Sequence, residues 1–149
     1  MRRLLVRAWR ALRPVQWRLL WFAHAKFMVG VTGVVRDEQG RVLLLKHRFW
    51  PEGRQWGLPG GWAKKAETFE DTLVREVREE TGLDIRVTGL AYLRSGYRLR
   101  AEVAFEAVLT GGSIAIDSFE VLEARWFAPD DLPPGVREPH LALINGHPC

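Results

Sequence analysis

The chain has 149 residues, a length that suits one domain and is too short for two full domains with a linker. Apolar residues make up 47% and charged residues 27%, close to the globular average, which excludes the disordered, collagen-like and low-complexity classes. The single cysteine, Cys149, excludes a disulfide within the chain and a zinc site built from cysteines. One cysteine also fits a reducing compartment, so we expect a cytoplasmic protein.

The net charge of +4 is unevenly distributed along the chain. Residues 1–26 carry seven basic side chains and no acidic one, while the remainder carries 15 basic and 18 acidic side chains. The sequence pI of about 9.7 therefore describes a basic head on a mildly acidic body. Because the body is acidic, we do not expect nucleic acid to be the main partner.

Residues 4–23 of this basic head alternate apolar side chains with arginines. The longest apolar run, residues 19–23, is far shorter than the roughly 20 residues that span a membrane, and no secretory signal pattern is visible. Apolar residues recur at helical spacing on both sides of Pro14, which predicts one or two basic amphipathic helices. These residues are Leu5, Trp9 and Leu12 before it, and Trp17, Leu20 and Trp21 after it.

Three interpretations of the head stay open. It can pack on its own domain or on a second subunit, as in a homodimer. It can lie at a membrane surface, with arginines on phosphate headgroups and tryptophans at the acyl boundary. It can also bind nucleic acid. We therefore expect a basic helical head of residues 1–26, at the membrane periphery in the second interpretation, and a separate domain of residues 27–149.

The rest of the chain alternates predicted strands with one strong helix. A polar turn at residues 36–40 joins two strands into a hairpin, and residues 49–61 are rich in glycine and proline. The predicted strands are residues 29–35, 42–45, 56–58, 85–93, 101–109 and 124–127. The predicted helical parts are residues 68–81 ending at Gly82, a short turn at 130–132, and a short helix in the tail. This order predicts the α+β class with a mixed β-sheet.

The predicted helix of residues 68–81 places three glutamates beside its apolar stripe. Glu76, Glu79 and Glu80 are spaced i, i+3 and i+4, so their carboxylates converge. Converging carboxylates beside an apolar surface stay ionised only with a positive partner, and Mg²⁺ or Mn²⁺ is the natural one. The alternative is a solvated acidic face paired with Arg75 and Arg78.

The loop before this helix adds to the signal. Pro59, Gly60 and Gly61 form a tight turn that can bring backbone groups close to a ligand. Glu67 directly precedes the helix, where it can cap the N-terminus, and Arg75 lies two turns further along and can reach Glu67.

Taken together, these residues resemble the signature of the Nudix hydrolase family. That signature is a glycine, five residues, a glutamate, seven residues, and then R-E-U-x-E-E-x-G-U, where U is aliphatic. Here it starts at Gly61, continues with Glu67 and ends with the run from Arg75 to Leu83, which includes Gly82. Every fixed position matches, and the resemblance covers roughly residues 27–135.

The resemblance implies a Nudix α/β/α sandwich around a mixed sheet. It also implies Mg²⁺- or Mn²⁺-dependent hydrolysis of a diphosphate linkage in a nucleoside diphosphate joined to another group. By position, Glu76, Glu79 and Glu80 match the metal ligands, together with the backbone carbonyl of Gly60. Gly61, Glu67, Arg75 and Gly82 match structural positions of the signature. The general base varies in this family, and Glu120 is our candidate, with Glu123 and Asp117 as neighbours that could replace it.

Substrate contacts are weakly indicated. Many members carry an acid three residues before the first glutamate of the signature and a glycine just before it, whereas this chain has Lys64, Lys65 and Ala66. The two lysines can meet phosphates instead. We expect Arg48 and Lys64 to contact phosphate and Trp56 to stack on a base. Two alternatives remain: a Nudix-fold nucleotide-binding or regulatory module without turnover, and a hydrolase of a membrane-linked diphosphate.

Overall fold

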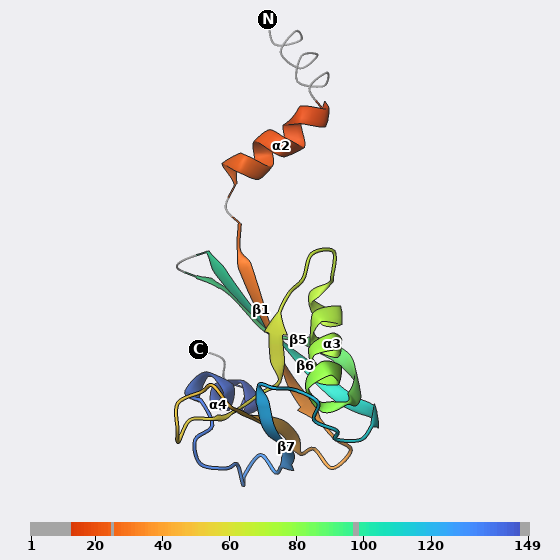
Figure 1. Cartoon of the computed structure of the whole chain (residues 1–149), viewed down its shortest axis with the longest axis vertical. Helices are drawn as coiled ribbons and strands as arrows, with labels where there is room; N and C mark the ends of the chain where they lie inside the picture. The colour runs from red at the N-terminus through yellow and green to blue at the C-terminus, as the bar shows by residue number, and fades with distance from the viewer. Residues whose placement is uncertain (1–12, 25, 97–98, 147–149) are drawn as a thin grey trace, which may run out of the picture.

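A computed structural model describes residues 13–24, 26–96 and 99–146 of the chain. Three helices and seven strands follow one another in the described part (Figure 1). The helices are α2 (Arg13–Ala23), α3 (Phe69–Thr81) and α4 (Glu138–Ile144). The strands are β1 (Met28–Arg36), β2 (Val42–His47), β3 (Trp56–Gly57), β4 (Gly60–Trp62), β5 (Leu83–Gly96), β6 (Arg100–Gly112) and β7 (Val121–Phe127).

The seven strands form one mixed sheet, as the sequence predicted. Its main order is β3-β2-β1-β6-β5, with β4 paired to β1 and β7 paired to β2. β1 and β6 run parallel, whereas the other pairs are antiparallel. β1 pairs with β4, which contains Gly60 and Gly61 of the signature region, and also with β6 of the long β5–β6 hairpin. β1 therefore lies between these two parts of the sheet.

α3 and α4 cover opposite faces of this sheet, which gives three layers (Figure 1). Two buried clusters lie between the layers, and β2 contributes to both because its side chains alternate between the faces. Leu43 and Leu45 belong to the cluster under α3, while Val42 and Leu44 belong to the cluster under α4. The expected α/β/α arrangement around a mixed sheet is confirmed.

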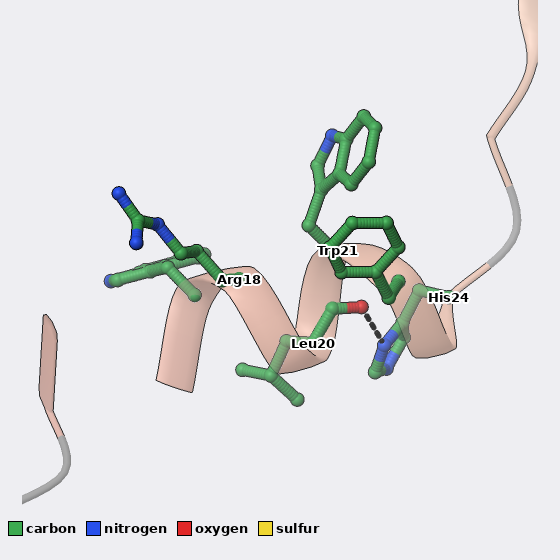
Figure 2. A pocket seen from close by; sticks show the side chains of 6 residues that line it. Arg18, Leu20, Trp21 and His24 are labelled. Carbon is green, nitrogen blue, oxygen red and sulfur yellow. Dashed lines mark hydrogen bonds between the residues drawn. The ribbon is translucent and has the colours of Figure 1, made fainter. Parts of the chain in front are cut away.

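α2 lies beyond the start of β1, away from the sheet and from α3 and α4 (Figure 1). Its apolar side chains remain exposed, with Trp17 at 79% and Phe22 at 75%. Figure 2 shows Leu20 and Trp21 pointing away from the helix on different sides, and the His24 ring donating a 2.7 Å hydrogen bond to the Leu20 carbonyl. No helix in the described residues is long and apolar enough to cross a membrane.

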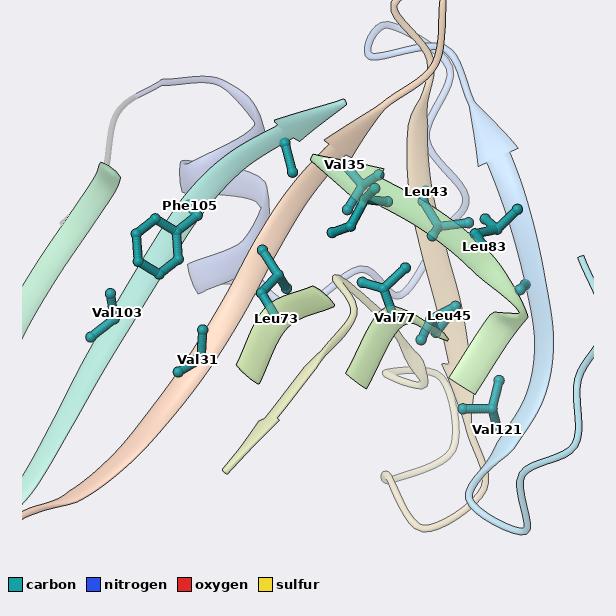
Figure 3. Close-up of a cluster of buried hydrophobic side chains, with 13 residues drawn as sticks. Val31, Val35, Leu43, Leu45, Leu73, Val77, Leu83, Val103, Phe105 and Val121 are labelled. Carbon is teal, nitrogen blue, oxygen red and sulfur yellow. The ribbon is translucent and has the colours of Figure 1, made fainter. Parts of the chain in front are cut away.

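The cluster under α3 explains why this helix docks where it does (Figure 3). Leu73 and Val77, one turn apart, are fully buried against β1 and β2. Gly33 of β1 lies directly beneath Leu73, and a Cβ there would overlap the leucine side chain. The missing side chain therefore lets α3 approach the sheet closely, which sets the depth of the whole helix.

Both ends of α3 carry caps that the sequence encodes. The Thr68 side chain accepts a hydrogen bond from the Asp71 backbone N–H at 3.0 Å. Gly82 ends the helix in the left-handed conformation with φ 73°, and its N–H donates to the Arg78 carbonyl. The predicted end at Gly82 is confirmed. Glu67 is not the cap, because Thr68 fills that position.

Three other expectations need correction. In place of a helical turn at residues 130–132, the structure has a turn over residues 128–131, closed by the Asp131 N–H on the Ala128 carbonyl, and the prolines that follow prevent continuation. β5 and β6 are several residues longer than predicted. Their backbone pairing continues into residues where apolar and polar side chains no longer alternate. β4 was expected to be loop, and it forms a strand by pairing with residues 30–32 of β1, away from the point at which β2 pairs with β1. The short tail helix is confirmed as α4.

Candidate active site

The turn between β3 and β4 brings the two signature glycines against β1 and α3. Thr32 pairs with Gly60 and Val31 with Gly61 across the β1–β4 ladder. A Cβ on Gly60 would overlap the β1 backbone, and a Cβ on Gly61 would overlap the Glu76 carboxylate. The β1 backbone therefore requires glycine at position 60, whereas a side chain at position 61 would displace the Glu76 carboxylate. The turn thus lies directly against one of the three converging glutamates of α3.

An arginine–glutamate pair ties the loop before α3 to the helix. Arg75 Nε donates to Glu67 Oε1 at 2.7 Å and Nη2 donates to Glu67 Oε2 at 3.1 Å. Glu67 also accepts from the Thr72 hydroxyl at 2.8 Å and from the Lys64 backbone N–H at 3.1 Å. These donors hold the pKa of Glu67 down at about 2, with the Arg75 hydrogen bond as the largest cause. The predicted contact between Arg75 and Glu67 is thus confirmed.

The same guanidinium reaches the converging glutamates. Arg75 Nη1 lies 2.7 Å from Glu76 Oε1 and 3.1 Å from Glu79 Oε2. Lys64 Nζ lies 3.8 Å from the other oxygen of Glu79, at the exposed rim of the site. The hydrogen bond with Glu67, followed by the contacts with Glu76 and Glu79, raises the pKa of Arg75 and keeps its charge, so one cation serves three glutamates. The sequence left open that these glutamates pair with Arg75 and Arg78 on an acidic helix face. The pairing with Arg75 is present, whereas Arg78 pairs with Asp84.

Glu80 stands apart from that arginine network. Its side chain is buried at 9% exposure, and its Oε2 has no hydrogen-bond partner in the described structure. Burial raises the pKa of Glu80 to about 8, the negative charges of Glu76, Glu120 and Glu79 add to the rise, and the Gly60 backbone opposes it. A buried carboxylate beside other carboxylates is stabilised either by taking up a proton, as the raised pKa of Glu80 indicates, or by a bound cation.

Glu120 approaches the cluster from the loop before β7. Its charge acts on Glu80, and its backbone carbonyl accepts a 2.8 Å hydrogen bond from the Arg48 N–H. The Arg48 Nε donates to the Phe119 carbonyl at 2.9 Å, and the guanidinium lies 5.2 Å from the Phe119 ring centroid. Arg48 thus holds the loop that carries Glu120. Glu120 lies near the converging glutamates of α3 although it is about 40 residues away from them in the sequence. Glu123 instead pairs with Arg125.

The donor set suits a hard divalent cation, although the side chains are not yet gathered around one point. No three His, Cys, Asp or Glu side chains within residues 13–24, 26–96 and 99–146 already form a ready ligand group. Arg75 holds two of the carboxylates, and the third offers a buried oxygen without a partner. Carboxylate and carbonyl oxygens are the ligands that Mg²⁺ and Mn²⁺ prefer. The residues fit such a cation once Glu76 and Glu79 turn from the guanidinium.

A hollow of about 340 Å³ lies on the α4 side of the sheet, and none of the glutamates described above lines it. Gly30 and Thr32 line it, and the same two residues pair with Trp62 and Gly60 of β4. Its remaining wall comes from β5, β6 and α4. The charged and polar lining residues are Tyr92, Arg94, Arg100, Glu102, Arg137, Glu138 and His140. Sequence analysis missed all of them, because no spacing connects these three elements before they fold.

His140 connects this hollow to the signature turn. Its Nδ1 accepts a 2.8 Å hydrogen bond from the Leu58 backbone N–H, two residues before Gly60. Burial lowers the pKa of His140 to about 4, with the Arg137 charge as a further cause, so Nδ1 stays an acceptor at neutral pH. Trp50 packs between His140 and His47, and a Cβ on Gly57 would overlap both Trp50 and His140. Through His140, α4 thereby supports the turn between β3 and β4.

Trp56 has a different environment from the one expected of a stacking surface. Its ring packs edge-on against Phe127 at 5.2 Å between centroids, and it borders the cluster under α4. This packing supports the fold, and stacking of a base on Trp56 stays a prediction. Trp62, by contrast, is exposed and carries the Arg100 guanidinium 4.9 Å from its ring centroid.

Comparison with known proteins places this geometry in a family. The model of the NUDIX domain matches residues 26–145. The chain is 37% identical over 106 residues to the NAD-capped RNA hydrolase NudC of an Enterobacter species, covering 69% of this chain and 39% of that protein. It is 31% identical over 106 residues to a candidate 8-oxo-dGTP diphosphatase of Bacillus subtilis, covering 70% and 68%.

The solved structures agree with the fold. An ADP-ribose pyrophosphatase of Streptococcus suis superposes with a TM-score of 0.63 at 27% identity, over 78% of this chain and 88% of that one. The chain spans about two fifths of the length of the NudC relative, so the match with that protein concerns one of its parts. The matched region includes the Gly60–Gly61 turn, the Arg75–Glu67 pair and the three converging glutamates of α3. The chain therefore belongs to the NUDIX domain family.

Proposed function

We propose that the protein hydrolyses the diphosphate linkage of a nucleoside diphosphate joined to another group, with Mg²⁺ or Mn²⁺ as cofactor. The observation that carries the proposal is the set of glutamates that α3 and the loop before β7 hold near the Gly60–Gly61 turn, namely Glu76, Glu79, Glu80 and Glu120. Glu80 among them is buried with an unpaired oxygen and a raised pKa. Such a cluster destabilises an empty fold and is useful only when cations and phosphates bind.

Each residue of the cluster takes a role in this proposal. Glu76, Glu79, Glu80 and the Gly60 carbonyl would hold the cation. When bound, that cation neutralises charge on the bridging phosphates and lowers the pKa of an attacking water. Arg75 remains clamped to Glu67 and positions the helix face.

Proton transfer and phosphate binding fall to residues at the rim. Glu120, on its loop beside Glu80, accepts the proton of the attacking water in this proposal. Lys64 at the rim binds a phosphate oxygen as a point charge. Arg48 supports the Glu120 loop through its contact with Phe119, and a phosphate contact from it is a further expectation.

The hollow beside β4 is the proposed site for one half of the substrate. Its volume of about 340 Å³ suits one nucleoside-sized group, and Arg94 of β5, Arg100 of β6 and Arg137 just before α4 line it. Relatives are named for NAD-capped RNA, 8-oxo-dGTP and ADP-ribose, each of which contains a nucleoside and a diphosphate linkage. We therefore propose a nucleoside diphosphate derivative as the small-molecule partner, bound with its diphosphate over the glutamates.

A second candidate is a hydrolase of a membrane-linked diphosphate. The specific observation in its favour is the exposed apolar surface of α2. A nucleotide-binding module without turnover is less favoured, since such a module has no need of a complete set of box glutamates, and this chain keeps them all.

One screen tests these candidates together. Full-length protein is incubated with Mg²⁺ or Mn²⁺ and a panel of nucleoside triphosphates, nucleotide sugars, ADP-ribose, NAD, dinucleoside polyphosphates and prenyl diphosphates, and the products are separated by chromatography. The Glu79→Gln variant serves as the blank. Turnover that needs the metal and disappears in the variant supports the proposal and identifies the substrate class. Nucleotide binding by calorimetry without turnover on any panel member would support the binding module instead.

A further inference from the structure

We propose that α2 is a docking element that binds the surface of an anionic lipid bilayer and holds the catalytic domain beside it. The proposal rests on α2 and the charge of the head, and it does not depend on the hydrolase activity. It selects one of the three interpretations that the sequence left open.

The first step is the uncovered apolar surface of α2. Its large apolar side chains are exposed, and an open hollow along the helix is lined by α2 and the residue that follows it (Figure 2). These exposed side chains are Val15, Trp17, Leu20, Trp21 and Phe22. Consecutive residues lie about 100° apart around a helix, so the apolar surface extends over more than one side. A short helix of this kind is normally covered by a partner, and the described part of the domain does not cover it.

The second step is the mixture of aromatic rings and cations on this surface. Lys26 Nζ lies 4.1 Å from the Trp21 ring centroid and 5.9 Å from that of Phe22. Arg18 lies one residue after Trp17 and is exposed. Tryptophan favours the boundary between headgroups and acyl chains because its ring is apolar and its N–H is polar. Lysine and arginine at the same depth meet lipid phosphates.

The third step is charge complementarity, which distinguishes a bilayer from the other occupants. The head of residues 1–26 carries seven positive side chains and no acid. Two such heads repel each other and cannot form ion pairs, which disfavours a helix-to-helix dimer. Nucleic acid would satisfy the cations but would leave the aromatic surface of α2 largely in water. An anionic bilayer satisfies both, because it offers negative phosphates above an apolar layer.

The experiment is co-sedimentation of the full-length protein with vesicles. One set of vesicles is phosphatidylcholine alone, and the other is phosphatidylcholine mixed with phosphatidylglycerol. We expect binding to the mixed vesicles at least about tenfold tighter than to the neutral ones, since each basic residue near an anionic surface contributes about fivefold. Added salt should weaken the binding without abolishing it, because the apolar contribution is not screened.

Matched variants locate the surface. The triple variant Trp17→Ser, Trp21→Ser, Phe22→Ser should lose about a hundredfold in affinity for mixed vesicles, since three aromatic side chains no longer enter the bilayer. Arg18→Gln should lose about fivefold. The control is Leu90→Ser with Leu93→Ser, which removes two leucines of β5 that are equally exposed. The control should bind like the wild type, and thermal melting verifies that every variant is folded.

Four outcomes would overturn the proposal. One is equal or absent binding to both kinds of vesicle by the full-length protein. Another is unchanged binding in the triple variant. The third is a dimer in sedimentation velocity that dissociates in the triple variant while vesicles are ignored, which would assign α2 to an interface between copies. Binding of RNA in place of mixed vesicles would count in the same way against the bilayer.

Discussion

α3 and α2 are helices of similar length, with 13 and 11 residues, and they have opposite environments. α3 is the more polar of the two, yet Leu73 and Val77 are fully buried and both ends are capped. α2 is rich in aromatic and aliphatic residues, and its exposed tryptophans contact no part of the sheet. The comparison teaches that burial follows the spacing of apolar residues more than their number.

The same comparison separates two uses of charge. α3 brings carboxylates together beside an apolar surface and balances them in part with Arg75. The head that includes α2 carries cations alone. A concentrated negative cluster fits metal and phosphate chemistry inside the domain, whereas an unbalanced positive segment fits a negative surface outside it.

The largest expected effect tests whether the α3 carboxylates are functional. Glu79→Gln should lower turnover of the substrate found in the screen about 10²- to 10³-fold, because it removes one negative oxygen from the proposed cation site. Glu70→Gln, in the first turn of the same helix and outside the cluster, should have little effect. Rates are measured by product chromatography. Equal rates in the two variants would mean that the converging glutamates are a solvated acidic helix face without a role in turnover.

The next effect tests the packing difference directly. Leu73→Ala should lower the free energy of unfolding by about 2–5 kcal/mol, because it leaves a cavity beneath α3. Leu20→Ala on the exposed α2 should change it by less than about 0.5 kcal/mol. Urea denaturation measures both. Similar losses in the two variants would mean that α2 is covered in solution.

A pH-dependent effect tests Glu80. Its pKa is raised from 4.5 to about 8 in the folded protein, so the folded state keeps a proton that the unfolded state releases. This contribution to stability is present below pH 4.5 and is lost as the pH rises through 8. With a chelator present, Glu80→Gln should therefore be more stable than the wild type by about 1–2 kcal/mol above pH 8, while losing activity. A variant less stable than the wild type at that pH would contradict the assignment.

The smallest expected effect is that of removing the head. We propose that residues 27–149 fold without residues 1–26, because the apolar side chains of α2 whose burial the structure describes are all exposed. The shortened protein should unfold within about 0.5 kcal/mol of the full chain and should hydrolyse soluble substrates at the same rate. Its vesicle binding should disappear. Aggregation of the shortened protein would show instead that the head covers part of the domain.

The site could be predicted in part because much of its information is local. The spacing of Glu76, Glu79 and Glu80, the glycine turn before them and the Arg75–Glu67 pair all lie within about two dozen residues. Helical geometry converts such spacing into proximity. The assignment of the N-cap to Glu67 failed because Thr68, one residue later, offers a shorter side chain that reaches the Asp71 N–H.

The remaining parts depend on contacts that spacing does not encode. Whether Glu120 lies near Glu80, and which residues line the hollow, depends on how β7 and α4 dock on the sheet. The pairing of β4 with β1 was likewise invisible, since its three residues lie in a stretch rich in glycine and proline.

The sequence by itself determined the α+β class, the helix α3 with its end at Gly82, and the family resemblance, because these depend on short-range periodicity and fixed spacing. Only the tertiary structure decided the parallel pairing of β1 with β6, the hydrogen bond from Leu58 to His140, and the exposure of α2. Leu58 and His140 are 82 residues apart. Such contacts are decided by which surfaces remain to be buried after the local elements form, and that is a property of the whole chain.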